Sequence, residues 1–159
     1  MERNSMHLTN HALKGKYVAW SLLAILAGGF IYVLFRPGEP IFFHWLGSIG
    51  FENWLGTVRE KSLSITRSLP PWMVYSLPNG LWAFAYTLLI LTIWKGSHSR
   101  LKYGWFLSIP LLVFGFELLQ FTGHLPGTFC KIDLLWGATG IILGVLTVNR
   151  TIYQLKPMR

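Results

Sequence analysis

The chain has 159 residues, of which 52% are hydrophobic and only 13% are charged. Soluble domains normally carry about a quarter charged residues, so this composition argues against a soluble globular domain. The hydrophobic residues form long runs, and the charges are almost confined to the gaps between them, which is typical of a chain surrounded by lipid. We therefore predict an all-α polytopic membrane protein that forms a single transmembrane domain over residues 1–159.

The net charge of +8 comes from fourteen Lys and Arg residues against six Asp and Glu. These basic residues lie beside hydrophobic runs, where Lys and Arg contact lipid headgroups and set orientation. We expect no nucleic-acid partner, because the sequence has no continuous basic stripe and no reading module. Cys130 is the only cysteine, which excludes an intramolecular disulfide and a cysteine-based metal cluster. We predict no metal site and no cofactor.

The first hydrophobic run, residues 18–35, follows Lys14 and Lys16 and ends at Arg36. It is too long for the core of a signal peptide, and no small-x-small cleavage site follows it. The run therefore predicts an uncleaved membrane helix.

Three further runs predict membrane helices over residues 72–94, 103–122 and 133–148. The first of them is bracketed by tryptophans and, at about 1.5 Å per residue, can cross a bilayer with some tilt. The run 133–148 is short for a span. Together with residues 18–35, these runs give four transmembrane helices.

The connection over residues 36–71 is too apolar for a free linker. Its apolar residues recur with helical spacing and its polar residues face the other way, which predicts an amphipathic helix lying in the membrane interface. This helix is either a packed cap over the helix ends or a lid that gates a ligand site. The apolar side is Phe51, Trp54, Leu55 and Val58, and the polar side is Glu52, Asn53, Thr57, Arg59 and Glu60.

Orientation follows from the distribution of Lys and Arg. Nine of them lie before the first helix, between the second and third, and after the fourth, whereas five lie in the other two connections. The positive-inside rule then predicts cytoplasmic N- and C-termini, with residues 36–71 and the connection between the third and fourth helices outside.

Four polar residues lie within or at the ends of the predicted helices, all toward the predicted outer side. Glu117 and Gln120 share one face of their helix because they are three residues apart, Asn79 lies early in its helix, and Asp133 opens the last one. Ionisable groups in a membrane are costly and are candidate functional groups. The alternatives are interhelical hydrogen bonding for Asn79 and Gln120 and a simple helix N-cap for Asp133.

Glu117 has no Lys or Arg within any predicted span to pair with it. It is therefore either protonated or exposed to a water-filled pocket. His124 and Lys131, in the short connection after its helix, are the only basic candidates nearby. The predicted ligand-binding residues are Asn79, Glu117, Gln120, His124, Lys131 and Asp133.

Small residues form a stripe on the last predicted helix. Asp133, Gly137, Gly140 and Gly144 follow one another at spacings of four, three and four, so a neighbouring backbone can approach closely along this stripe. Gly80 belongs to a comparable small-residue patch on the helix over 72–94. The simplest assembly packs the last three helices together with the polar cluster inward and leaves the first helix peripheral.

The stretch Glu117-Leu-Leu-Gln120, the turn that ends at Asp133, and Gly140-Ile-Ile-Leu-Gly144 are similar to motifs of the VanZ-like family of small bacterial membrane proteins. The resemblance covers roughly residues 76–146, where Asn79 resembles an Asn that the family carries early in the preceding helix. It implies a bacterial plasma (inner) membrane location and an outward-facing polar site. The family's founding member is associated with antibiotic resistance, to a glycopeptide, at the cell surface.

We predict that this polar cluster binds a lipid headgroup, a lipid-linked cell-envelope precursor or an envelope-active compound. Glu117 would accept a hydrogen bond or proton, Asn79 and Gln120 would orient the ligand, and Asp133 would hold the turn before its helix. The alternative is a structural or sensory subunit whose glycine stripe binds further copies or a partner membrane protein, and which could form a pore. Membrane lipids are expected partners in either case.

We expect binding rather than enzymatic activity. The sequence contains neither a zincin motif nor Gly-x-Ser-x-Gly. Two carboxylates and His124 could nevertheless carry out acid–base chemistry.

Overall fold

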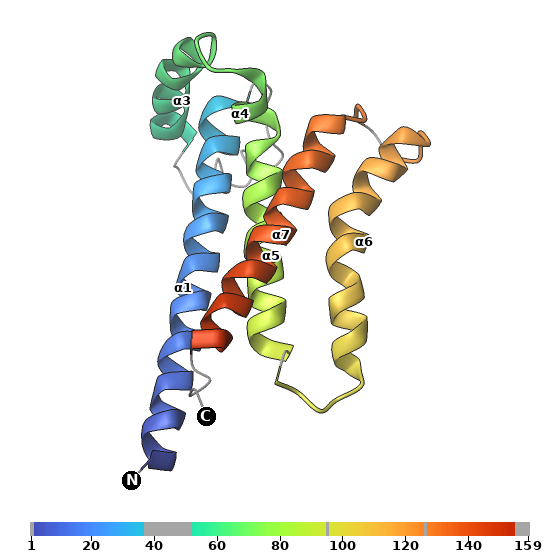
Figure 1. Ribbon diagram of the computed structural model, residues 1–159. Helices are drawn as coiled ribbons and strands as arrows, with labels where there is room; N and C mark the ends of the chain where they lie inside the picture. Colours follow the sequence, from blue (N-terminus) through green and yellow to red (C-terminus); the bar gives the residue numbers. More distant parts are fainter. Residues whose placement is uncertain (1, 37–51, 95, 126, 155–159) are drawn as a thin grey trace.

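The computed structural model describes residues 2–36, 52–94, 96–125 and 127–154. These residues form helices and connecting turns without a strand, and four of the helices are long and apolar enough to cross a membrane. The predicted all-α polytopic class is therefore confirmed. The described helices are α1 (Glu2–Phe35), α3 (Glu52–Thr66), α4 (Pro71–Tyr75), α5 (Leu77–Trp94), α6 (Leu101–Phe121) and α7 (Lys131–Gln154) (Figure 1).

Two of the helices extend beyond the hydrophobic runs that predicted them. α1 begins at Glu2 rather than at residue 18, and α7 begins two residues before and ends six residues after the run 133–148. Hydropathy locates the part of a helix that lies in lipid, but backbone hydrogen bonding continues the helix into polar sequence.

The expected helix over residues 72–94 is divided at Ser76 into α4 and α5. Pro78 causes the break, because it lacks a backbone N–H and its ring clashes with the carbonyl four residues earlier, that of Val74. The side chains of Val74, Ser76 and Pro78 are all buried. The break places the first turn of α5, with Asn79, beside the start of α7.

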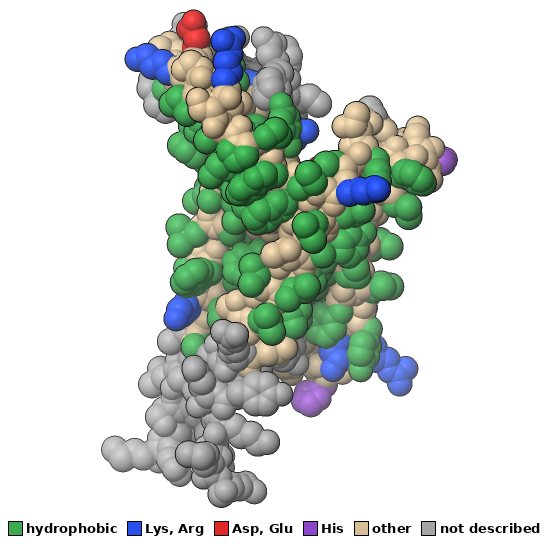
Figure 2. All heavy atoms as spheres, turned by 45° about the horizontal axis from the view of Figure 1, so that its top comes forward, with side chains coloured by type: hydrophobic (Ala, Val, Ile, Leu, Met, Phe, Trp, Pro, Cys, Tyr) green, Lys and Arg blue, Asp and Glu red, His purple; other side chains and the backbone are tan. Residues whose placement is uncertain are grey.

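Different elements lie at the two ends of the helix bundle (Figure 1). α3, α4 and the connection between α6 and α7 lie at one end, which we call the α4 end, and the start of α1 and the connection between α5 and α6 lie at the other. Stacked indoles link helices near both ends: Trp72 with Trp136, at 5.2 Å between ring centroids, and Trp94 with Trp105, at 6.0 Å. On the face seen in Figure 2, hydrophobic side chains cover the middle of the molecule, and Lys and Arg lie toward its ends.

α5 is the central helix, and its most extensive contacts are with α7 and α1. Half of the span formed by α4 and α5, Pro71–Trp94, is buried, whereas only 11% of the α6 span is. α6 touches α5 and α7, and a 2.8 Å hydrogen bond between the hydroxyls of Tyr86 and Ser108 ties it to α5. The expectation of a peripheral first helix is therefore wrong, because α6 occupies the peripheral place.

A stripe of α1 explains why this helix packs along α5. Four of its residues recur at spacings of four, three and four, and all four are buried. A Cβ on Gly28 would lie 2.6 Å from Trp82 Nε1, so only glycine leaves room for the indole, whose N–H donates to the Ile25 carbonyl at 3.3 Å. The stripe is Tyr17, Ser21, Ala24 and Gly28.

The glycines of α7 bring its backbone against its neighbours. A Cβ on Gly140 would overlap the carbonyl oxygen of Gly80 on α5, and one on Gly144 would lie 2.9 Å from the Thr87 side chain. Gly137 instead faces α6, where a Cβ would meet Val113 at 2.6 Å. The glycines of α7 are therefore already in contact with α5 and α6 of the same chain.

Thr87 is fully buried in the contact between α5 and α7, and its hydroxyl has no hydrogen-bond partner among the described residues. Leaving such a hydroxyl unpaired costs about 1–3 kcal/mol. We expect Thr87→Val, which keeps the side-chain shape, to raise the midpoint of thermal unfolding in detergent. Thr92→Val is the control, since the Thr92 hydroxyl donates to the Leu88 carbonyl at 2.6 Å. A lower midpoint for Thr87→Val than for Thr92→Val would contradict this assignment.

α3 caps the end of α1. The Arg59 guanidinium donates to the Arg36 carbonyl at 2.8 Å, and the Thr66 hydroxyl donates to the Phe35 carbonyl at 3.1 Å. Carbonyls at a helix C-terminus lack partners within the helix, so these donors stabilise the end of the first span. Arg59 is only 7% exposed, and the expectation that it faces away with the other polar residues is wrong. The side chains of residues 51–55 lie outside the described part of the chain.

Candidate functional site

A cavity of about 720 Å³ lies toward the α4 end, between α1, α5, α6 and α7. This volume falls within the range of small-molecule sites, about 300–1,000 Å³. We call it the polar cavity, because four of the residues expected in a ligand site line it. They are Asn79, Glu117, Gln120 and Asp133.

Asn79 and Asp133 join α5 to α7 across the wall of this cavity. Asn79 Nδ2 donates to Asp133 Oδ2 at 3.2 Å. The other carboxylate oxygen, Asp133 Oδ1, is buried and has no hydrogen-bond partner among the described residues. A buried carboxylate oxygen without a donor is energetically costly, so Asp133 Oδ1 can accept a hydrogen bond from a molecule in the cavity.

Glu117 binds the start of α7. Its side chain is 8% exposed, and Oε2 accepts a 3.0 Å hydrogen bond from the backbone N–H of Cys130, the residue just before α7. The N-terminus of a helix favours a negative charge, so the helix end supports this carboxylate without a cation. Glu117, and not the Asp133 side chain as expected, therefore holds the turn between α6 and α7.

Gln120 lies under the connection between α6 and α7. Gly127 passes over it with a φ of +135°, a conformation that favours glycine, and a Cβ there would lie 2.5 Å from Gln120 Nε2. Within the described residues the Gln120 side-chain amide forms no hydrogen bond. Its donor and acceptor are thus available to a molecule in the cavity.

Arg36 is a cavity residue that the sequence reasoning missed. Its guanidinium lies 4.9 Å from the ring centroid of Tyr32 and 5.7 Å from that of Tyr75, and it has no ion pair with a described carboxylate. Its position directly after the first hydrophobic run is a sequence signal, but a basic residue there commonly serves only to set membrane topology. With α1 expected at the periphery, nothing connected Arg36 to the polar cluster.

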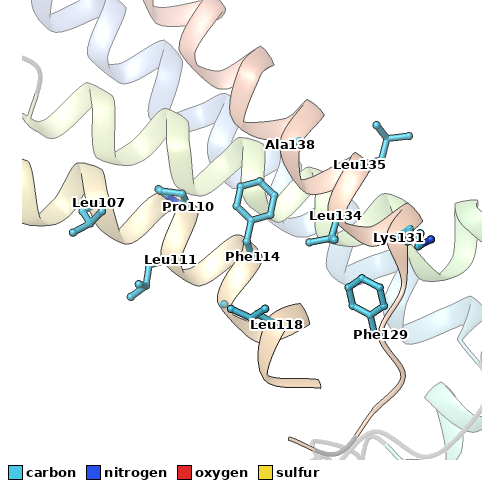
Figure 3. Close-up of a pocket in the computed structure, with 11 residues that line it drawn as sticks. Leu107, Pro110, Leu111, Phe114, Leu118, Phe129, Lys131, Leu134, Leu135 and Ala138 are labelled. Atoms are coloured by element: carbon cyan, nitrogen blue, oxygen red, sulfur yellow. The ribbon is translucent and has the colours of Figure 1, made fainter. Parts of the chain in front are cut away.

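His124 and Lys131 lie outside the polar cavity, although they were expected in the site. Both are exposed, and His124 Nδ1 is 2.9 Å from the Thr122 hydroxyl. Lys131 lines a separate apolar groove of about 850 Å³ between α6 and α7. Figure 3 shows this groove, into which Phe114 and Leu134 project from the two helices.

The polar cavity offers several kinds of recognition. Carboxylates accept hydrogen bonds from amines and hydroxyls, and a guanidinium matches phosphate or carboxylate groups. Aromatic and aliphatic residues complete the walls. In the described ranges, no three His, Cys, Asp or Glu residues gather as a metal site would require. The remaining wall residues are Tyr32, Trp82, Ala83, Tyr86, Leu112, Val113, Phe116, Gly127, Thr128 and Gly137.

The sequence matches no protein-family model, and comparisons with curated proteins and with solved structures gave no match. Function is therefore inferred from the polar cavity.

Proposed function

We propose that this chain is a VanZ-like protein of the bacterial plasma membrane. Its polar cavity binds the headgroup of a lipid, a lipid-linked cell-envelope precursor or an envelope-active compound. The observation that carries the proposal is the meeting of Asn79, Glu117 and Asp133, from three different helices, around a cavity large enough for a ligand. One buried oxygen of that cluster, Asp133 Oδ1, has no donor among the described residues.

Helix packing alone does not account for these groups. Glycines and apolar residues already hold α5 against α7, and a second carboxylate beside them adds a desolvation cost in a membrane. A bound molecule that donates to both carboxylates offsets this cost. We therefore assign the cluster to binding rather than to assembly.

The resemblance to the VanZ-like family supports the same location. Four of the residues that carry it, Asn79, Glu117, Gln120 and Asp133, line the polar cavity. The excess of Lys and Arg in the segments at the opposite end favours an α4 end that faces the outer side of the membrane. An outward-facing cavity suits a molecule of the cell envelope.

Assembly through the glycine stripe is the weaker alternative. Gly140 and Gly144 already pack against α5, so a second copy has no access to them. Gly140→Leu would therefore unfold the single chain rather than separate subunits.

The test is thermal stability of the detergent-purified wild type and of Glu117→Gln, each with and without a lipid extract of the cell envelope. Glutamine keeps the shape of Glu117 and can still accept from Cys130 N–H. Ligand at about 100 times its Kd stabilises a protein by about 2.7 kcal/mol, so we expect the extract to raise the midpoint of the wild type by several degrees. We expect most of that rise to be lost in Glu117→Gln.

Glu60→Gln is the matched control, because it makes the same change at an exposed position of α3 outside the cavity. It should respond to the extract as the wild type does. Equal responses in Glu117→Gln and Glu60→Gln, or no response in the wild type, would refute the proposed binding site.

A further inference from the structure

The walls of the polar cavity change in character with depth. Near the α4 end they carry Arg36, Asn79 and Gln120, whereas deeper in the bundle they carry Leu112 and the ring of Tyr86, whose hydroxyl is already hydrogen-bonded to α6. Leu112 precedes the end of α6 by nine residues, about 14 Å at helical rise. A polar end and an apolar interior along the helix axes match a molecule with a polar head and a hydrocarbon chain.

Among the described helices, packing leaves one side of the cavity open. α1 and α6 both line it, but each packs on α5 and they make no extensive contact with each other; in Figure 1 they stand on opposite sides of α5 and α7. Leu112 and Phe116 line the cavity and are nevertheless exposed. A hydrocarbon chain can therefore leave the cavity sideways, into the bilayer, between α1 and α6.

The charges specify the headgroup. Arg36, directly after α1, has no carboxylate partner among the described residues and presents a guanidinium that pairs well with phosphate. Glu117 and Asp133, on α6 and α7, accept hydrogen bonds and need amine or hydroxyl donors. A headgroup that satisfies all three carries both a phosphate and such a donor.

We propose that the ligand is a membrane lipid and not a water-soluble compound. Its phosphate lies at Arg36, its amine or hydroxyl donors lie at Asp133 and Glu117, and its hydrocarbon portion passes between α1 and α6 along Leu112 and Phe116. This inference rests on the proposed function and names the class of its ligand. The apolar groove of Figure 3 does not offer the charges of the polar cavity, because Lys131, which is exposed, is the only charged residue that lines it.

The first experiment compares four probes by the thermal shift of the full chain in detergent. Phosphatidylethanolamine and phosphatidylglycerol carry a phosphate and a donor, phosphatidylcholine carries a phosphate without a donor, and glycerophosphoethanolamine carries a complete headgroup without chains. We expect phosphatidylethanolamine or phosphatidylglycerol, or both, to stabilise the protein at a concentration about tenfold lower than phosphatidylcholine does. This is a tenfold difference in apparent affinity. Glycerophosphoethanolamine should have no effect.

Two results would overturn the inference. If glycerophosphoethanolamine stabilises the protein as well as its lipid does, the headgroup is bound without its chain, and the binding site itself stands. If neither donor-bearing lipid stabilises the protein at a lower concentration than phosphatidylcholine does, the assignment of donors and phosphate is wrong. If the envelope extract does not raise the unfolding midpoint of the wild type, the proposed function itself is refuted.

The second experiment tests the path of the chain with a matched pair of variants. Leu112 and Leu119 are both on α6 and both 43% exposed, but only Leu112 lines the polar cavity. Leu112→Trp should raise the half-saturating lipid concentration about tenfold, and Leu119→Trp should leave it unchanged. If Leu112→Trp does not fold, Phe116→Trp takes its place. Equal lipid responses in the cavity variant and Leu119→Trp would contradict the proposed path.

Discussion

Gly140→Ala should destabilise the protein by about 3 kcal/mol, the size of severe overpacking. The added methyl would overlap the Gly80 carbonyl oxygen and lie 2.9 Å from the backbone nitrogen of Phe84. Both are main-chain atoms of α5, so only separation of α5 from α7 relieves the overlap. That contact is the most extensive in the bundle, and the gain of about 1 kcal/mol in helix propensity does not compensate for its loss.

Gly115→Ala is the control for this effect. Gly115 is also within a membrane helix, and a Cβ there would meet nothing within 4 Å. The same methyl should leave the protein as stable as the wild type or slightly more so. Thermal unfolding followed by circular dichroism in detergent measures both variants. Equal midpoints for the two variants would show that the close approach of α5 and α7 does not stabilise the fold.

Asp133→Asn should weaken lipid binding about tenfold or more, at least 1.4 kcal/mol, with little effect on stability without lipid. The new amide oxygen can still accept from Asn79 Nδ2, so the link between α5 and α7 persists. Its nitrogen takes the place of the oxygen that lacks a partner. A donor then replaces an acceptor, and the negative charge that attracts amines and hydroxyls is lost.

Titration with phosphatidylethanolamine and phosphatidylglycerol, followed by native mass spectrometry, measures this loss. Glu60→Gln again serves as the control, since it removes a carboxylate at an exposed position of α3. An affinity of Asp133→Asn equal to that of Glu60→Gln would exclude Asp133 from the binding site.

The positions of the polar residues along their helices were predictable, but their partners were not. Helical rise places Asn79, Glu117 and Asp133 at a similar depth, and all three line one cavity. Which carboxylate receives the Cys130 N–H depends on the path of the connection through Gly127, which hydrophobic patterns do not encode. For the same reason, His124 and Lys131 were expected near Glu117 although they lie outside the cavity.

The neighbours of α1 were harder to infer, although a signal was present. Ser21, Ala24 and Gly28 repeat the small-residue spacing that marks α7, but the first helix was expected to be peripheral because it is almost wholly apolar. Arg36 lies just beyond a predicted span, and Arg59 lies on the polar face of a predicted helix. Charges at such positions commonly serve only to set membrane topology. Their contacts with Tyr32 and with the end of α1 exist only once the helices are packed.

The central claim is that the polar cavity holds a lipid headgroup, and the most direct test is native mass spectrometry of the protein purified from its own membrane in mild detergent. We predict that the wild type retains one phosphate-bearing lipid per chain, and that Asp133→Asn loses it while Glu60→Gln keeps it. A wild type that retains no lipid, or the same retained lipid in all three proteins, would contradict the claim.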